Sequence, residues 1–309
     1  MNCAIGIDVG GTKIAAGIVL IPSGEVCGKR LEPTRPERGG VAVLEDVESL
    51  AESLIEEAKR HKLEPVALGV GVAELVDPQG NVLSEATIKW KYLPVRERFA
   101  KLLPVRVEAD VRAAALAEAR LGAGMGRATF LYITVGTGIS SCLVVNGIPF
   151  VGARGLTGTF ASSPGLTPGE DGLLHSGPPL EQFAAGPALA ARLKSVRPDF
   201  SGSSKDVLSL TESGDGDATG IVESAGQAVG AAVAHLVNVL DPEAVVLGGG
   251  LGMAGGAYRK AITTSFHSQV WSDLHRDLPL LTAQLGSDAG FIGAALVAAE
   301  NQDSAPQPC

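Results

Sequence analysis

The residues with the clearest chemical potential form a glycine-rich turn near the beginning of the chain. Asp8 ends an apolar stretch, and Gly10, Gly11, Thr12 and Lys13 follow it. Because glycine has no Cβ, consecutive backbone N–H groups can converge on a phosphate there, and the hydroxyl of Thr12 adds a donor. A carboxylate at Asp8 would hold Mg²⁺ through water. A tight turn in which Asp8 bonds nearby amides explains the same residues, so both interpretations stand.

A second position with chemical potential is Asp110, which follows the apolar run 105–109 and begins a predicted helix over 111–121. Aspartate is a favoured N-cap, and it is also placed here to act as a general base. The helix N-terminus favours the ionised carboxylate, so the sequence predicts a low pKa for Asp110. Such a base suits phosphoryl transfer, in which catalysis is mostly positioning. Glu181 begins another predicted helix, where an exposed first-turn carboxylate is the simpler explanation.

A glycine pattern late in the chain also fits a nucleotide site. Gly250, Gly252 and Gly255 follow an apolar strand at the spacing of a dinucleotide fingerprint, and Asp273 lies about 20 residues further on. The segment is so rich in glycine that this spacing arises readily. A dinucleotide-dependent oxidoreductase is therefore the least favoured function.

The elements that must position these residues alternate along the chain. Strands are predicted over 4–8, 13–20, 66–72, 105–109, 129–135, 139–145, 244–247 and 278–283, and helices over 42–61, 111–121, 180–194, 204–211, 218–240 and 288–299. This alternation indicates an α/β protein. Residues 5–14 and 132–139 resemble each other as strand, Gly/Thr turn and strand, about one domain length apart. The pair predicts a duplicated, two-lobed architecture, although any hairpin can repeat such a pattern.

Length and composition narrow the class of protein. The 309 residues favour two domains, and 45% hydrophobic against 19% charged residues indicates a globular chain. A net charge of −9 argues against binding to duplex nucleic acid. Residues 128–153 carry no charge, but glycine and proline break them into strands and turns, so no membrane span is expected. No signal peptide is evident, and the four scattered cysteines are typical of reduced thiols in the cytoplasm.

Taken together, these segments resemble the ROK family of sugar kinases and repressors, within the superfamily of actin, hexokinase and Hsp70. The resemblance runs from residue 4 to about residue 299 and depends on five motifs. They are Gly6-Ile-Asp-Val-Gly-Gly-Thr-Lys13, Ile133-Thr-Val-Gly-Thr-Gly-Ile139, Gly152-Ala-Arg-Gly155, Asp241-Pro-Glu-Ala-Val-Val-Leu-Gly-Gly-Gly250 and Gly290-Phe-Ile-Gly-Ala-Ala295.

The resemblance implies a two-lobed, actin-like ATPase fold of the ribonuclease H-like type, with a cleft between the lobes. The expected small lobe spans residues 1–110, with a C-terminal helix at about 286–300 packed back on it. The larger lobe is expected over 111–285, and residues 301–309 are expected to form a disordered tail. A cytoplasmic homodimer is also implied by the resemblance.

The implied function is an ATP-dependent, Mg²⁺-requiring kinase for a primary hydroxyl of a sugar-like polyol. The residues expected to bind ATP are Asp8, Gly10, Gly11, Thr12, Lys13, Gly136, Thr137, Gly138, Gly249 and Gly250. Asp110 aligns with the family's catalytic base, Glu181 with a sugar-binding carboxylate, and Asp8 with the residue that orients the metal ion.

The chain departs from the family pattern on the sugar side. The family's Asn-Asp at the base is Ala109-Asp110 here, and the Asn that follows is Arg112. The segment whose Glu binds sugar and whose His ligates zinc or meets the sugar reads Gly-Thr-Phe-Ala-Ser over 158–162. All three zinc-binding cysteines are replaced within 172–179, which predicts no structural zinc.

These losses predict an acceptor other than ordinary glucose, such as an amino sugar or a cyclitol with a hydroxymethyl group. A sugar hydroxyl that loses its buried partner costs about 1–3 kcal/mol. The expected substrate-binding residues are Asp110, Glu181, Thr159, Ser162 and Glu74. Glu74 replaces a family glycine after the central strand and would suit an amine, while a solvated loop glutamate is the simpler explanation.

Two alternatives remain besides the oxidoreductase: a glucokinase-type hexose kinase and a non-catalytic, sugar-sensing ROK protein. ROK repressors carry an N-terminal helix-turn-helix, and the first strand here begins within a few residues of Met1, so no DNA-binding element is expected. The retained Asp110 and both glycine turns favour a working kinase. Either ATP or polyphosphate remains possible as the donor.

Overall fold

The computed structural model describes residues 1–300, without the side chains of residues 167 and 168. The predicted tail over 301–309 lies outside the described residues. The chain divides into two compact units. Unit 1 contains residues 1–126, 144–157 and the segment from 284 onward, and unit 2 contains residues 127–143 and 158–283.

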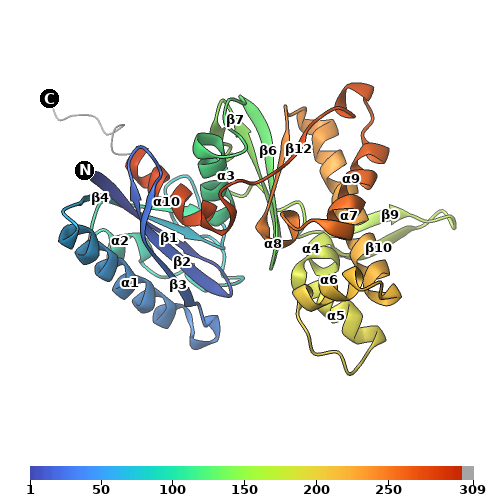
Figure 1. Ribbon diagram of the computed structural model, residues 1–309, viewed down its shortest axis with the longest axis horizontal. Helices are drawn as coiled ribbons and strands as arrows, with labels where there is room; N and C mark the ends of the chain where they lie inside the picture. Colours follow the sequence, from blue (N-terminus) through green and yellow to red (C-terminus); the bar gives the residue numbers. More distant parts are fainter. Residues whose placement is uncertain (301–309) are drawn as a thin grey trace. The chain divides into compact units, whose positions relative to one another are not determined.

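A five-stranded mixed sheet forms the centre of unit 1 (Figure 1). Its strands in spatial order are β3 (Val26–Pro33), β2 (Lys13–Leu20), β1 (Asn2–Val9), β4 (Glu64–Val72) and β5 (Val105–Ala109). β1 pairs antiparallel with β2 and parallel with β4, and β4 pairs parallel with β5. The last six residues of β4 are all buried, as expected of a central strand covered on both faces.

Helix α1 (Gly40–Arg60) covers one face of this sheet. Its apolar residues Val43, Val47, Leu50 and Leu54 are buried, which confirms the helical stripe predicted over 42–61. They share a core with alternate residues of β1, namely Ile5, Ile7 and Val9. The intervening residues of β1 must therefore point to the opposite face, because side chains alternate along a strand. The short helix α2 (Val95–Phe99) precedes β5.

Helix α10 (Ala289–Glu300), from the end of the described chain, lies on that opposite face (Figure 1). It approaches Gly6 of β1 and Gly69 of β4, which are partners in the sheet. A Cβ on Gly6 would lie 1.9 Å from the carbonyl oxygen of Phe291, so only glycine permits this approach. Helix α10 thus packs within unit 1.

Unit 1 is larger than the lobe predicted over residues 1–110. Helix α3 (Asp110–Leu121) belongs to it, although the sequence predicts residues 111–285 for the other lobe. The physical reason is packing: α3 lies against α10 so closely that a Cβ on Gly293 would lie 1.8 Å from the carbonyl oxygen of Ala113.

A second five-stranded sheet, whose strands belong to unit 2 except for β8 and the end of β7, repeats the first in its strand order. Its strands are β12 (Leu280–Thr282), β11 (Val245–Gly248), β6 (Thr129–Val135), β7 (Ile139–Val145) and the short β8 (Ile148–Pro149). The order β12-β11-β6-β7-β8 corresponds to β5-β4-β1-β2-β3, and β6 and β11 are parallel like β1 and β4. The duplication predicted from the two similar hairpins is confirmed. Asn146 and Gly147 both have positive φ, as the predicted hairpin turn requires.

Helices dominate the rest of unit 2. They are α4 (Leu180–Ala184), α5 (Gly186–Val196), α6 (Ser204–Glu212), α7 (Gly216–Leu240), α8 (Gly249–Gly252) and α9 (Gly256–Gln269). The continuous helix predicted over 180–194 is wrong, because the chain breaks between α4 and α5. Within the described range, only α7 is long and apolar enough to cross a membrane by composition, but it packs against α9 as a core helix does.

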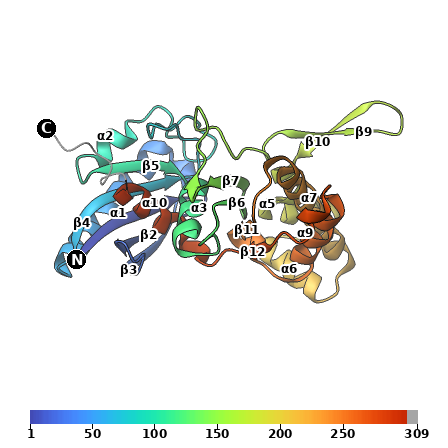
Figure 2. The same ribbon diagram turned by 90° about the horizontal axis from the view of Figure 1, so that it is seen from above.

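A two-stranded hairpin of β9 (Pro164–Pro168) and β10 (Leu174–Pro179) projects from unit 2 (Figure 2). It occupies part of the segment in which the zinc cysteines are replaced. Its residues from 174 to 178 are exposed. The sequence does not predict this hairpin, because the exposed residues 174–178 give no alternation of buried and exposed positions.

Candidate functional site

The first glycine turn joins β1 to β2 in unit 1. The amide of Gly10 donates to the carbonyl of Lys13 at 3.0 Å, which closes the turn. Thr34 holds it from the side, because its hydroxyl donates to the carbonyl of Gly10 at 2.6 Å and its amide to that of Thr12 at 3.1 Å. Thr12 and Lys13 remain exposed. The turn is therefore rigid and accessible, as a phosphate-binding turn must be.

Asp8 lies at the end of β1, on the face covered by α10. Its Oδ1 is buried and has no hydrogen-bond partner among the described residues. A Cβ on Gly290 would lie 2.2 Å from its Oδ2, so the beginning of α10 packs directly on this carboxylate. Burial raises the pKa of Asp8, the neighbouring Asp110 raises it further, and Lys13 lowers it. A buried carboxylate oxygen without a donor is an observation that fits a hydrated cation.

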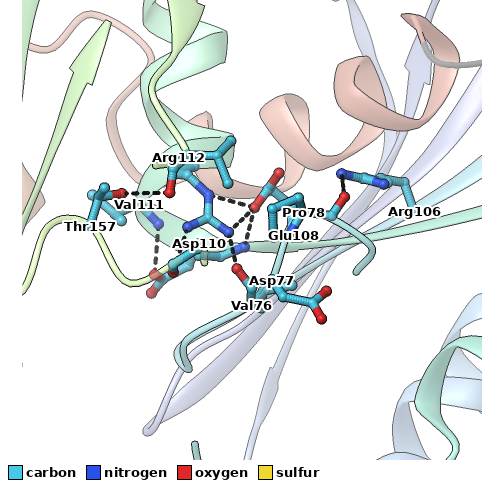
Figure 3. A network of polar contacts seen from close by, with 12 residues as sticks. Val76, Asp77, Pro78, Arg106, Glu108, Asp110, Val111, Arg112 and Thr157 are labelled. Atoms are coloured by element: carbon cyan, nitrogen blue, oxygen red, sulfur yellow. Dashed lines mark hydrogen bonds and ion pairs between the residues drawn. The ribbon is translucent and has the colours of Figure 1, made fainter. Parts of the chain in front are cut away.

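Asp110 begins α3 directly after β5 (Figure 3). Its Oδ1 accepts a hydrogen bond from the amide of Val111 at 2.6 Å. The sequence predicts a low pKa for Asp110 because it stands at a helix N-terminus, and the structure corrects this. Burial is the largest influence and raises the pKa, while the Val111 amide and Arg112 lower it and Glu74 raises it. A carboxylate whose pKa approaches neutrality is a better general base than an ordinary aspartate.

Asp8 and Asp110 lie close together in unit 1. A Cβ on Gly71 would be 3.6 Å from Oδ1 of Asp8 and 3.7 Å from the Cα of Asp110. Gly71 pairs with Asp8 in the sheet and with Glu108 of β5 on its other side. The two carboxylates therefore meet at the carboxyl ends of parallel strands, where ligands bind in open α/β sheets.

Glu74 follows β4 and is only 7% exposed. Its carboxylate accepts hydrogen bonds from the amides of Thr87 at 2.6 Å, Ile88 at 2.7 Å and Ala86 at 3.0 Å, and from the hydroxyl of Ser84. The interpretation as a solvated loop glutamate is thus wrong. The carboxylate organises the loop over 84–88, and Thr87 of that loop lies beside the first glycine turn, since a Cβ on Gly11 would lie 2.7 Å from Cγ2 of Thr87.

The second glycine turn joins β6 to β7 in unit 2. The amide of Gly136 donates to the carbonyl of Gly138 at 2.9 Å, and Thr137 lies between them. Glu181, at the beginning of α4, accepts a hydrogen bond from the amide of Ile139 at 2.8 Å. A Cβ on Gly138 would lie 2.6 Å from Oε2 of Glu181, so the carboxylate supports the turn directly.

Gly249 and Gly250 follow β11 beside this second turn. Gly249 has φ of 76°, and a Cβ there would lie 2.4 Å from the carbonyl oxygen of Val135. A Cβ on Gly136 would be 3.8 Å from the amide nitrogen of Gly250. The two glycine segments expected to hold ATP in this half of the sequence are thus neighbours. The fingerprint from Gly250 to Gly255 runs from α8 into a separate α9, without the single strand-turn-helix that a dinucleotide site needs.

Thr159 and Ser162 lie on an exposed turn, closed by a hydrogen bond from the amide of Ser162 to the carbonyl of Thr159 at 3.0 Å. The preceding Gly158 accepts hydrogen bonds from Ser140 and Ser141 of β7, which attach this turn to unit 2. Among residues 1–300, no group of three or more His, Cys, Asp and Glu could hold a metal ion. The absence of structural zinc stays a prediction.

The expected site residues thus form one group in each unit. Asp8, the first turn, Glu74 and Asp110 belong to unit 1, and the remaining residues belong to unit 2. Sequence reasoning missed Thr34, which fixes the first turn, and Glu108, which pairs with Arg112. The only signal for the latter is the i, i+4 spacing of opposite charges at the start of a helix.

Comparison with known proteins identifies the family to which this chain is similar. The ROK family profile matches residues 4–301. A glucokinase of Streptomyces coelicolor is 33% identical over 327 residues, which cover 97% of this chain and 98% of the relative. An N-acetylmannosamine kinase of Haemophilus influenzae is 28% identical over 305 residues, covering 96% and 94%.

Solved structures agree with this result. The crystal structure of a ROK family glucokinase from Streptomyces griseus, in complex with glucose and AMPPNP, matches with a TM-score of 0.81 at 29% identity, covering 96% of this chain and 99% of that one. The expected fold class, a two-lobed actin-like α/β fold, is confirmed. The expected class of enzyme, a phosphotransferase acting on an alcohol group, is that of these relatives. The chain belongs to the ROK family of sugar kinases and repressors.

Proposed function

We propose that this protein is an ATP-dependent kinase that phosphorylates a primary hydroxyl of a sugar-like polyol other than ordinary glucose. The observation that carries the proposal is the pair Asp8 and Asp110 at the carboxyl ends of β1 and β5. One carboxylate has a buried oxygen without a donor, and the other has a raised pKa and only one oxygen engaged by its own helix.

Asp110 is the general base in this mechanism. The amide of Val111 orients its carboxylate through Oδ1, and no described hydrogen bond engages Oδ2. The acceptor hydroxyl transfers its proton to Asp110 while its oxygen attacks the γ-phosphorus, and the bond from that phosphorus to the leaving oxygen breaks. The raised pKa allows Asp110 to hold this proton near neutral pH.

Asp8 is the residue that would orient Mg²⁺ through water. The fit rests on its buried Oδ1, which lacks a hydrogen-bond donor in the described chain. When bound, Mg²⁺ offsets phosphate charge. The first turn, closed by Gly10 and Lys13 and held by Thr34, would present its amides to the phosphates. Gly136, Thr137 and Gly138 would do the same in unit 2, with Gly249 and Gly250 near the adenosine.

The acceptor is inferred from what the chain lacks. Ala109, Thr159 and Ser162 replace groups that bind sugar in the family, so several glucose hydroxyls would lose partners at about 1–3 kcal/mol each. Asp110 and Glu181 remain to bind the acceptor. Glu74 contributes through the loop that it holds, since its carboxylate already accepts four hydrogen bonds. An amino sugar or a hydroxymethyl cyclitol fits best, and the N-acetylmannosamine kinase relative supports the first.

A substrate panel tests the proposal. The purified chain is assayed for phosphate transfer from Mg·ATP to glucose, mannose, glucosamine, N-acetylmannosamine and hydroxymethyl cyclitols, with Asp110→Asn as the control. Polyphosphate replaces ATP in a parallel series. We expect kcat/KM for an amino sugar or cyclitol to exceed that for glucose at least tenfold.

Other outcomes identify the alternatives. Glucose phosphorylated as fast as any other acceptor would support a glucokinase-type hexose kinase, which the Streptomyces coelicolor relative favours. Acceptor binding without transfer to any compound would support a sugar-sensing protein and refute the kinase. A cytoplasmic homodimer stays a prediction from the resemblance, and light scattering of the purified chain would test its mass.

A further inference from the structure

Arg112 is a fully buried cation next to the proposed base. It lies on the first turn of α3, two residues after Asp110, and its side chain is 2% exposed. Arginine is almost never buried to this extent unless it is paired. The fold therefore has to provide hydrogen-bond partners for this buried charge.

The guanidinium is held by three partners (Figure 3). Its Nε donates to Oε1 of Glu108 at 2.6 Å, its Nη2 donates to the carbonyl of Val76 at 2.6 Å, and its Nη1 donates to the carbonyl of Gly155 at 3.1 Å. Oε1 of Glu108 also accepts from the amide of Ala109 at 2.9 Å. The planar fork of arginine can reach acceptors in several directions at once, which neither asparagine nor lysine can do.

The two carbonyls belong to segments that carry expected acceptor residues. Val76 lies two residues after Glu74, and Gly155 ends the Gly-Ala-Arg-Gly motif four residues before Thr159. The segments also touch each other, since Gly155 has φ of 74° and a Cβ there would lie 2.0 Å from the carbonyl oxygen of Val76. Arg112 thus fastens both segments to the helix turn that carries Asp110.

We propose that Arg112 is a positioning residue for the acceptor: by binding the carbonyls of Val76 and Gly155, it fixes two acceptor-side segments relative to Asp110. The role rests on the proposed function. The competing explanation is a buried ion pair with Glu108 that only supports the fold. Removing one partner of such a pair destabilises the protein strongly, because the other charge stays buried alone. Replacing both partners by neutral groups destabilises it much less.

This difference allows an experiment that separates the two explanations. Arg112→Met alone leaves Glu108 charged and buried, so it is expected to unfold at lower urea concentration. The double variant Glu108→Gln/Arg112→Met removes both charges, and its midpoint of unfolding in urea is expected to return most of the way to that of the wild type. The carbonyls of Val76 and Gly155 still lack their donor in the double variant. The matched control is Glu48→Gln/Arg98→Met, which removes another part-buried ion pair of unit 1.

The assay uses the full chain, Mg·ATP and the best acceptor of the panel. For Glu108→Gln/Arg112→Met we expect acceptor kcat/KM to fall about 100-fold, as misplacement of about 1 Å can cost, with KM for ATP within twofold of the wild type. Amide hydrogen exchange should accelerate in residues 75–77 and 153–157 and remain unchanged in β1 and β4. The control should leave acceptor kcat/KM within twofold.

Acceptor kcat/KM at the wild-type level in the folded double variant overturns the role of Arg112 and leaves the proposed function intact. Equal losses for acceptor and ATP also overturn it, because they indicate general damage. If the wild-type chain transfers phosphate to no acceptor, the proposed function itself fails, and the role of Arg112 fails with it.

Discussion

Gly69→Ala tests how closely α10 must lie on the first sheet. A Cβ at this position would lie 1.8 Å from the carbonyl oxygen of Ala294 and 2.2 Å from its carbonyl carbon. Ordinary contact for a Cβ begins at 3.4 Å, so strand and helix would have to separate by 3.4 − 1.8 = 1.6 Å at this point. Both sides of the contact are backbone, which cannot rotate away as a side chain can.

The expected cost follows from this geometry. Overpacking a core costs about 1–3 kcal/mol when side chains can adjust, and here a helix must move instead. Gly69→Ala should therefore lower the free energy of unfolding by about 3 kcal/mol or more. Urea titration followed by circular dichroism measures this as a lower midpoint at an unchanged slope.

Gly220→Ala is the matched control. Gly220 lies inside α7, and a Cβ there would meet nothing within 4 Å. Alanine is favoured over glycine in a helix interior by about 1 kcal/mol, so this variant should be more stable than the wild type. If Gly69→Ala unfolds at the wild-type midpoint while Gly220→Ala is stabilised, the close approach of α10 to β4 is not as described.

Three further predictions concern the carboxylates and the second turn. Asp110→Asn should reduce kcat by about 10²–10⁴-fold with ATP affinity within twofold, and loss of ATP binding in calorimetry would instead indicate a structural role. Asp8→Asn should stabilise the folded chain on the order of a few kcal/mol at pH 8. The folded-state pKa of Asp8 is raised, so the stabilising contribution of its protonated form is complete below the unfolded-state pKa and is lost as pH rises through the folded-state pKa. The denaturation curves of the wild type and Asp8→Asn should therefore converge towards pH 4. Curves of the two proteins that stay equal at pH 8 contradict the burial of Asp8. Gly138→Ala should raise KM for ATP severalfold, because its Cβ would lie 2.6 Å from Oε2 of Glu181 and displace the carboxylate from the amide of Ile139. An unchanged KM would separate this turn from the nucleotide.

Many helices and strands could be predicted from the sequence because burial leaves either an apolar stripe at helical spacing or a continuous apolar run. The helix over 42–61 has one buried face, and the apolar run over 66–72 is a strand buried on both sides. The break in the helix predicted over 180–194 does have a local signal, Gly186-Pro187, because a proline disfavours helical geometry at the residue before it. The structure adds a contact from elsewhere in the chain: the amide of Gly186 donates to the carbonyl of Gly136 at 2.8 Å instead of to its own helix.

The pKa of Asp110 shows where local reasoning about a site ends. The sequence identifies the helix N-terminus, which lowers the pKa, but it does not reveal how deeply the carboxylate is buried or that Glu74 lies near it. Glu74 looks like a solvated loop residue in the sequence, because the backbone amides that donate hydrogen bonds to it belong to residues 86–88, more than ten positions away. Burial and contacts at long sequence separation decide both cases, and neither leaves a periodic trace.

The duplication shows why the proposed chemistry resides in one unit. Asp8 pairs in register with Gly71, and the corresponding residue of the second sheet, Thr134, pairs with Gly248. Both sheets therefore offer a glycine turn after the same strand, but only the first carries a carboxylate at its end. Asp8 and Asp110 both belong to unit 1, so the distance between the proposed base and the metal-orienting residue is set by one packed core. The two carboxylates and their mutual repulsion are therefore a property of unit 1 alone.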